Sequence, residues 1–304
     1  MVYSFYEVRC SPWVGQKSHP LSYYRGAMNT DIKVQDIFDN ILYYIDLFLE
    51  QGILIFKELN PTRQEEWDLM KAFGDHIGWF PNSSVTGEPR SPYLSIEDED
   101  HETTFRRYAE PLSDDEIFID WHIENVEKDN YQTGALWHMR KFDCDPNSGQ
   151  TGFINMTKFF CNMPQDWQKF LGVCTVSFLN QANEFGVMRK VEFSESLPER
   201  SIVVPHHANQ KLIYRPSLSG KEVLRSVNGL TPSSEEYSLF KEIEEWTINQ
   251  TINSPSNQTW FKWNVGDTMI VDLSVMAHAV KGGFNLGERY FSRIWAHRFS
   301  MDMI

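Results

Sequence analysis

Two side chains that can bind a metal ion stand two residues apart, at His122 and Glu124. On an extended strand, residues at this spacing point to the same face. A third ligand is expected from His278, which follows an apolar, strand-like run at residues 268–271. Two imidazoles and one carboxylate on one side of a metal leave coordination positions open, as O₂-activating Fe(II) chemistry requires. The same donors also suit zinc.

A segment near the C-terminus carries two arginines, Arg289 and Arg293. On the period of two residues that a strand imposes, both point to the same face as Phe291, Trp295 and His297. Guanidinium groups among aromatic side chains need carboxylate partners. Those partners are either Asp and Glu side chains of the protein or a bound dicarboxylate, and the sequence alone leaves both explanations open.

The adjacent pair His206-His207 is a further candidate for metal binding by residue type. Neighbouring residues of a strand point to opposite faces, so one ion rarely takes both. We therefore do not expect a second metal site there.

The elements that must position these side chains begin with a mostly helical support over residues 1–80. Apolar residues between positions 34 and 49 follow one helical stripe, which Gly52 ends. A short buried strand is predicted at residues 53–56. A second helix is expected to open at Asn60-Pro61 and to end at about Phe73.

The middle of the chain changes in character. Residues 81–117 are polar and rich in turn-forming residues, which predicts either a lid over a site or a surface loop. From residue 118 to residue 304, short β-like runs alternate with turns, and one further helix is expected near residues 233–248. The runs include residues 152–154, 173–176, 201–204, 268–271 and 290–299. This pattern predicts a mainly β sandwich or jelly roll with flanking helices, in a single domain over residues 1–304.

The composition excludes several classes of function. A formal net charge of -14 opposes binding to nucleic acid. No apolar run is long enough to span a membrane. Four scattered cysteines without a CxxC pair indicate neither a disulfide framework nor a zinc-cysteine site. We therefore expect a cytoplasmic protein that acts on a small molecule.

Five segments, spread over most of the chain, share motifs with one known family. They are Gly52–Phe56 with the helix that leads to Gly74, Trp121–Glu124, Ser148–Thr151, Trp263–Asp267, and His278 through Arg293. These segments resemble the taurine dioxygenase (TauD/TfdA) family of Fe(II)/2-oxoglutarate oxygenases. The resemblance implies a double-stranded β-helix (jelly-roll) core and an enzyme that requires Fe(II), 2-oxoglutarate and O₂.

At the matching positions, the resemblance also implies roles for individual residues. The residues implied to bind iron are His122, Glu124 and His278. Thr151 and Arg289 are implied to hold the remote carboxylate of 2-oxoglutarate. Arg293 either shares that carboxylate or binds an acidic group of the primary substrate.

Glu124 departs from the family pattern, in which Asp is usual. A minority branch that includes clavaminate synthase and several amino-acid oxygenases also has Glu there, so the resemblance favours an amino-acid-like or zwitterionic substrate. Hydroxylation of an unactivated C–H bond is the expected reaction, with desaturation or oxidative cyclisation as other outcomes in specialised metabolism. Polar contacts to such a substrate are expected from Asn125, Glu127, Arg225 and Asn228.

Three alternatives are open at this point. A zinc hydrolase would use the same three ligands but would not explain Arg289 and Thr151. A non-catalytic jelly-roll protein that binds metal or ligand would release no succinate. A protein or peptide hydroxylase would have a broad groove in place of a closed pocket.

Overall fold

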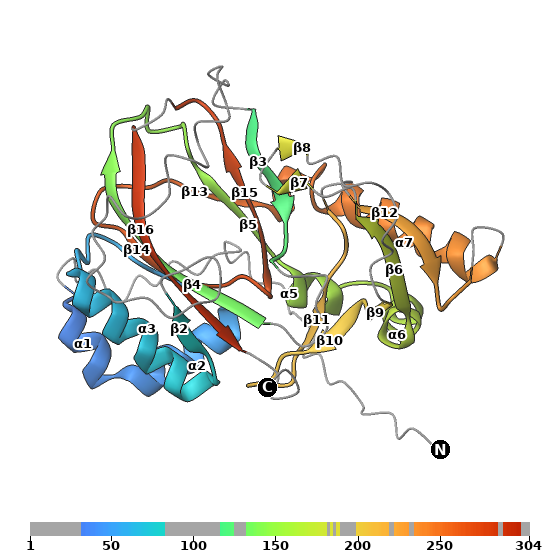
Figure 1. Cartoon of the computed structure of the whole chain (residues 1–304), viewed down its shortest axis with the longest axis horizontal. Helices are drawn as coiled ribbons and strands as arrows, with labels where there is room; N and C mark the ends of the chain where they lie inside the picture. The colour runs from blue at the N-terminus through green and yellow to red at the C-terminus, as the bar shows by residue number, and fades with distance from the viewer. Residues whose placement is uncertain are drawn as a thin grey trace.

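The computed structural model describes most of the chain from Ile32 onward (Figure 1). The described residues are 32–82, 116–124, 132–180, 183–184, 187–188, 199–218, 222–230, 234–284 and 288–298. Residues 83–115, which make up most of the predicted lid or surface loop, lie outside them, as do Asn125 and Glu127.

The N-terminal part consists of three helices and one strand. They are α1 (Val34–Asp39), α2 (Ile41–Gln51), β1 (Ile53–Phe56) and α3 (Arg63–Ile77). The single helical stripe predicted over residues 34–49 is divided at Asn40, whose φ of -123° and ψ of 29° take it out of the helix. Gly52 ends α2 in the left-handed conformation, with φ 79°, as its position predicts.

Helix α3 begins and ends later than predicted. Thr62 caps it, because the Thr62 hydroxyl accepts the Glu65 N–H while the Glu65 carboxylate accepts the Thr62 N–H at 2.7 Å. This capping box outweighs the Asn-Pro signal just before it. Gly74 lies inside the helix for a packing reason, since a Cβ there would be 2.4 Å from the carbonyl oxygen of Trp79. The helix ends at Gly78, with φ 76°.

The larger of two central sheets has five antiparallel strands in the order β1-β14-β4-β16-β2. The other bounds are β14 (Thr268–Asp272), β4 (Gln132–Phe142), β16 (Arg289–Arg298) and β2 (Phe80–Asn82). Helices α1 to α3 cover its outer face (Figure 1), with Phe48, Phe73 and Ile294 in the shared core. Trp79 packs on Gly134, where a Cβ would be 2.0 Å from the indole ring.

The smaller central sheet has the order β13-β5-β15-β3. Its strands are β13 (Thr259–Phe261), β5 (Thr151–Asn155), β15 (Met276–Lys281) and β3 (Ile117–His122). It faces the larger sheet across a core that includes Trp137, Phe153, Met269 and Trp295. The two antiparallel sheets form a double-stranded β-helix, which confirms the predicted mainly β fold with flanking helices.

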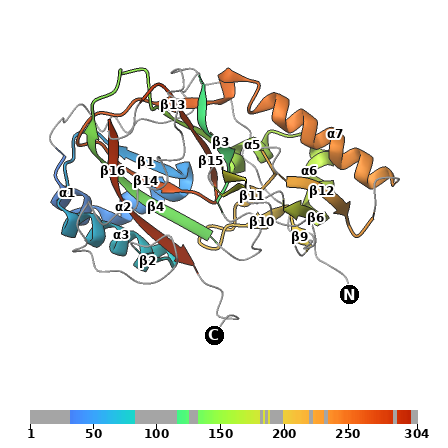
Figure 2. The same cartoon turned by 45° about the horizontal axis from the view of Figure 1, so that its top comes forward.

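A third layer covers the other face of the smaller sheet (Figure 2). It contains α5 (Met156–Cys161), α6 (Gln165–Val173), α7 (Glu235–Gln250) and the sheet β12-β6-β9, with bounds Glu222–Val227, Thr175–Asn180 and Arg200–Ser201. Helix α7 confirms the helix expected near residues 233–248. Trp121 and Ala277 of the smaller sheet meet Phe160 and Ile243 of this layer in one core.

Shorter elements complete the described chain. They are the hairpin β10 (Val203–Pro205) and β11 (Leu212–Tyr214), the pair β7 (Asn183–Glu184) and β8 (Val187–Met188), and a 3₁₀ turn at Pro255–Asn257. Within the described ranges, no helix combines the length and the apolar character that crossing a membrane requires.

Candidate metal centre

The three predicted metal ligands come together on β3 and β15. His122 is the last residue of β3, Glu124 follows outside the strand, and His278 belongs to β15. His278 lies directly opposite His122 in the antiparallel pairing, and the centroids of their rings are 4.1 Å apart. One ligand atom from each of the three residues lies within 4.8 Å of the others. No other group of three metal-binding side chains is this close in the part of the chain that the structure describes.

The hydrogen bonds of His122 prepare it for metal binding. Its Nδ1 lies 2.7 Å from the carbonyl oxygen of Asp120, and because a carbonyl only accepts, Nδ1 must carry the proton. Nε2 is therefore the ring atom that can bind a cation, once it has given up any proton that it shares with Glu124. This Nε2 lies 3.5 Å from Oε1 of Glu124, and Nε2 of His278 lies 3.8 Å from the same oxygen. The donor set thus fits a divalent transition metal.

The surroundings of Glu124 keep its carboxylate ionised. Desolvation raises its pKa, but the hydrogen bond and charge of His122, together with His278 and Arg293, lower the pKa to about 2. Burial is the main cause that lowers the pKa of His278 to about 3, and His122 adds to it. At neutral pH the centre therefore offers a carboxylate and a neutral imidazole, which are the forms that bind a metal ion.

The backbone of Glu124 is tied to the turn between β14 and β15. Its N–H donates to the carbonyl oxygen of Leu273 at 3.3 Å, and the N–H of Leu273 donates to the carbonyl oxygen of Thr133 at 2.9 Å. The expectation that His122 and Glu124 share one regular strand is wrong in detail, because β3 ends at His122. The turn, and not the strand, brings the carboxylate to the histidines.

A buried guanidinium lies in the same core as the metal candidates. Arg289 is only 5% exposed, and its NH2 donates to the hydroxyl of Thr151 at 3.1 Å. The indole N–H of Trp263 donates to the same hydroxyl oxygen at 2.9 Å. No carboxylate among the described residues pairs with Arg289, and its Nε has no hydrogen-bond partner there. Burial lowers the pKa of Arg289 to about 10. Burying a cation is costly unless an anion pairs with it, and no described residue supplies that anion.

Aromatic side chains form a chain of contacts between the guanidinium and the histidines. The Arg289 guanidinium is 4.9 Å from the centroid of the Phe291 ring. Trp137 has its ring 5.9 Å from that of Phe291 and 5.8 Å from that of His278. Neither Trp137 nor the bond from Trp263 to Thr151 was expected from the sequence. A strand prediction over residues 132–142 would have revealed Trp137.

Arg293 lies on the same face of β16 as Arg289. Its guanidinium is 5.6 Å from the centroid of the Trp295 ring, and Trp295 belongs to the core between the two sheets. The guanidinium is also close enough to Glu124 to lower the pKa of that carboxyl group. The predicted shared face of β16 is therefore present, and Arg293 lies toward the metal candidates.

The structure describes only part of the predicted substrate contacts. Asn125 and Glu127 fall outside the described residues, and only the backbone of Arg225, in β12, is described. Asn228 accepts the N–H of Thr175 at 2.8 Å and donates to Glu236. Its side chain thus links elements of the third layer, and a substrate contact there stays a prediction.

The comparisons with known proteins agree with this geometry. A sequence model of the family described as taurine catabolism dioxygenase TauD, TfdA matches residues 21–295. The chain belongs to the TauD/TfdA family. It is accordingly an Fe(II)/2-oxoglutarate-dependent dioxygenase, and the family's cofactors, Fe(II), 2-oxoglutarate and O₂, fit the His-Glu-His group. The predicted family, enzyme class and cofactors are confirmed.

Solved structures share the fold at low sequence identity. One is a taurine dioxygenase from Burkholderia xenovorans, with 17% identity, a TM-score of 0.52, and coverage of 85% of this chain and 80% of that chain. Another is AAD-2 in complex with Mn(II) and N-oxalylglycine, with 13% identity, a TM-score of 0.56, and coverage of 86% and 88%. No curated protein is similar to this TauD/TfdA member in sequence at a significant level.

Proposed function

We propose that His122, Glu124 and His278 hold Fe(II), and that Arg289 and Thr151 bind the remote carboxylate of 2-oxoglutarate. The observation that carries this proposal is the buried Arg289 guanidinium, which no described carboxylate neutralises, in the same core as the His-Glu-His group. A zinc hydrolase would need the three ligands but not this cation. A bound dicarboxylate such as 2-oxoglutarate would account for both the three metal ligands and the Arg289 guanidinium.

The iron and cosubstrate, when bound, supply an oxidant for an unactivated C–H bond while 2-oxoglutarate is converted to succinate and CO₂. The protein's own residues bind and orient the reactants. Trp263 donates to the Thr151 hydroxyl oxygen and so leaves its proton free to meet a carboxylate oxygen. Phe291 and Trp137 exclude water beside His278, which strengthens the attraction between a carboxylate and the guanidinium.

We propose a small, amino-acid-like or zwitterionic substrate. Two features support it: the Glu ligand at position 124, which the amino-acid oxygenase branch shares, and the second guanidinium of Arg293 near the metal candidates. Arg293 either shares the cosubstrate carboxylate or binds an acidic group of the substrate. Hydroxylation is the proposed reaction, and desaturation or cyclisation are its variants when the substrate carbon is held farther from the metal.

We also infer a single oxygenase domain and a cytoplasmic location. The support for one domain is that three adjoining cores connect the helices, both central sheets and the third layer. The support for the location is the sequence, in which four scattered cysteines form no CxxC pair.

The test is anaerobic reconstitution of the protein with Fe(II) and 2-oxoglutarate. A weak visible charge-transfer band is expected, followed by succinate release when O₂ and a panel of amino-acid-like compounds are added. His122→Ala and His278→Ala are expected to abolish both signals. His76→Ala, on the exposed face of α3, is the matched control and is expected to retain them. Wild-type protein that binds Fe(II) without releasing succinate would support the non-catalytic alternative instead.

A second experiment separates the two roles of Arg293. An Arg293→Gln protein that needs more 2-oxoglutarate for half-maximal succinate release would place the guanidinium on the cosubstrate. Unchanged dependence on 2-oxoglutarate, together with loss of the stimulation by the primary substrate, would place it on the substrate.

A further inference from the structure

The loop between β10 and β11 carries the adjacent pair His206-His207, and the two rings have different partners. Their centroids are 4.8 Å apart, so the rings do not point to opposite faces as a strand would require. Nε2 of His206 lies 2.9 Å from Oδ2 of Asp272. Nε2 of His207 bonds to the carbonyl oxygen of Ile77 at the end of α3. The pair thus joins two parts of the fold and is no metal site.

The contact between His206 and Asp272 is fully buried, since the two residues are 1% and 2% exposed. Nδ1 of His206 accepts the N–H of Ala208 at 3.3 Å, so the ring proton is on Nε2 and is donated to the carboxylate. The other carboxylate oxygen, Oδ1, accepts the N–H groups of Ser274 and Val275 at 3.0 and 3.2 Å. Asp272 therefore fixes the turn between β14 and β15 from inside.

This turn is the same one that holds the backbone of Glu124 through the carbonyl oxygen of Leu273. Directly after the turn, Met276 begins β15, which carries His278. Two of the three candidate metal ligands thus depend on a turn whose conformation is set by the Asp272 carboxylate. His206 donates to Oδ2 of this carboxylate, the oxygen that the N–H groups of the turn do not use.

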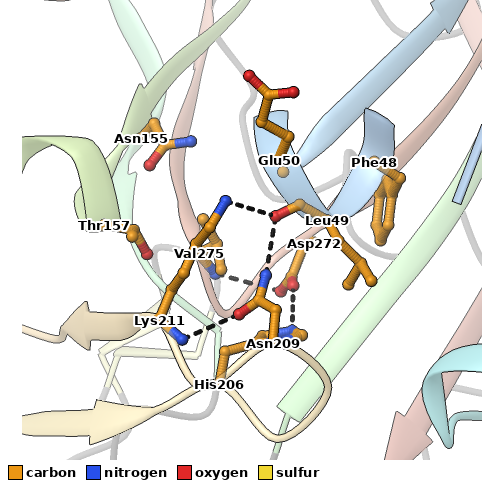
Figure 3. A pocket seen from close by; sticks show the side chains of 11 residues that line it. Phe48, Leu49, Glu50, Asn155, Thr157, His206, Asn209, Lys211, Asp272 and Val275 are labelled. Atoms are coloured by element: carbon orange, nitrogen blue, oxygen red, sulfur yellow. Dashed lines mark hydrogen bonds and ion pairs between the residues drawn. The ribbon is translucent and has the colours of Figure 1, made fainter. Parts of the chain in front are cut away.

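We propose that His206 is a positioning residue of the metal centre, acting through Asp272 and the β14–β15 turn on Glu124 and His278. The inference rests on the proposed metal ligands. Without the imidazole, Oδ2 of Asp272 would lose its donor and the carboxylate would turn toward another one. A small pocket that Asn209 and Lys211 help to line adjoins the pair (Figure 3), and both of these side chains carry donors. A rotated carboxylate would release Ser274 and Val275, and the turn would loosen.

The neighbouring residue provides a matched control. His207 is also a histidine of the same loop and also donates from Nε2, but its acceptor is at the end of α3, away from the β14–β15 turn. Burial lowers the pKa of His207 to about 4, so the His207 ring is neutral. The His206 ring is also neutral, because its Nδ1 accepts a hydrogen bond. A purely structural role of the loop predicts similar effects from both histidines. A positioning role predicts that only His206 affects metal binding.

The experiment is a Co(II) titration of metal-free protein, followed by its d–d absorption, with the free energy of unfolding measured on the same samples. We compare the wild type with His206→Leu, His206→Gln and His207→Leu. In His206→Leu the Kd for Co(II) is expected to rise about tenfold, as for other residues that orient metal ligands from outside. His206→Gln keeps a donor at the Nε2 position, and His207→Leu removes the hydrogen bond to the carbonyl oxygen of Ile77. Both are expected to bind Co(II) within about twofold of the wild type.

Each outcome has a distinct meaning. Equal Co(II) affinity of His206→Leu and the wild type, or equal weakening by His206→Leu and His207→Leu, would overturn the positioning role. Failure of the wild type to bind Co(II) would instead refute the proposed ligand set. If His206→Leu does not fold, His206→Asn takes its place, because its shorter amide does not reach Asp272. Weakened binding in His206→Asn but not in His206→Gln would then support the role, and equal binding in these two variants would refute it.

Discussion

His278 and His122 are direct partners in the antiparallel pairing of β15 with β3, and their rings lie 4.1 Å apart. The pairing becomes irregular immediately beyond them, between His278 and Val280. Bulges next to active sites re-aim side chains. Here the irregularity lies within β3, between Ile119 and His122, and Glu124 reaches the two imidazoles from beyond the other side of His122.

The length of the side chain at position 124 is expected to matter for metal binding. Its backbone is held by Leu273, so an Asp in its place is one methylene short and has no strand to bring it closer. Glu124→Asp is expected to weaken Co(II) binding by about tenfold or more. Titration of the metal-free protein measures this. Wild-type affinity in Glu124→Asp would mean that the turn moves freely, contrary to its hydrogen bonds.

Removal of the buried guanidinium is expected to impair cosubstrate binding and leave the metal site intact. Arg289→Ala deletes one partner of a buried, charged hydrogen bond, which costs about 2–5 kcal/mol. The apparent KM for 2-oxoglutarate is thus expected to rise by about 100-fold, while the Kd for Co(II) stays near that of the wild type. Thr151→Val, which removes one neutral donor, is expected to have a smaller effect, about tenfold. An unchanged KM in Arg289→Ala would remove the cosubstrate assignment.

Local sequence patterns predicted the parts of the centre that depend on neighbouring residues. The shared face of Arg289 and Arg293 follows from the geometry of a strand. The strand expected to carry both His122 and Glu124 ends at His122, so strand geometry does not place Glu124. The pairing of His278 with His122 is a long-range contact, and a single sequence contains no signal for its register. The same holds for the bond from Leu273 that places Glu124.

β4, the longest strand among the described residues, was not among the predicted runs because its pattern is not that of a simple buried strand. Gly134 and His138 interrupt the apolar residues, and Arg140 and Lys141 add charge. The structure accounts for these residues through tertiary contacts. Gly134 makes room for Trp79, and His138 and Arg140 bind a buried carboxylate on α3. Such partners are distant in the sequence, so the strand was missed.

That carboxylate, Glu66, is expected to be one of the main electrostatic contributions to stability. It is fully buried and accepts hydrogen bonds from His138 at 2.7 Å, Ser292 at 2.7 Å and Arg63 at 2.6 Å, as well as from Arg140. Glu66→Gln removes the charge and leaves its donors buried without a full partner. The free energy of unfolding is expected to fall by about 3–5 kcal/mol, as measured by denaturant titration.

The pH dependence of stability provides a second test of Glu66. Desolvation raises its pKa, but the hydrogen bonds and charges of its partners outweigh this and lower the pKa below the ordinary value of 4.5. The stabilisation is therefore complete above pH 4.5 and is lost as the pH falls toward the folded-state pKa. Glu66→Gln should show less of this acid destabilisation. Asp75→Asn, in the exposed pair with Lys71 on the same helix, should follow the wild type within about 0.5 kcal/mol.

The packing of Trp79 on β4 is expected to make Gly134 intolerant of even one methyl group. A Cβ at Gly134 would be 2.0 Å from the Trp79 ring, and Trp79 is only 1% exposed. Gly134→Ala is expected to lower the free energy of unfolding by about 1–3 kcal/mol. Gly172, in α6, is the matched control, because nothing lies within 4 Å of its added Cβ. Gly172→Ala is expected to raise stability by about 0.5–1 kcal/mol. The same sign of change in both variants would contradict the close packing of Trp79 against β4.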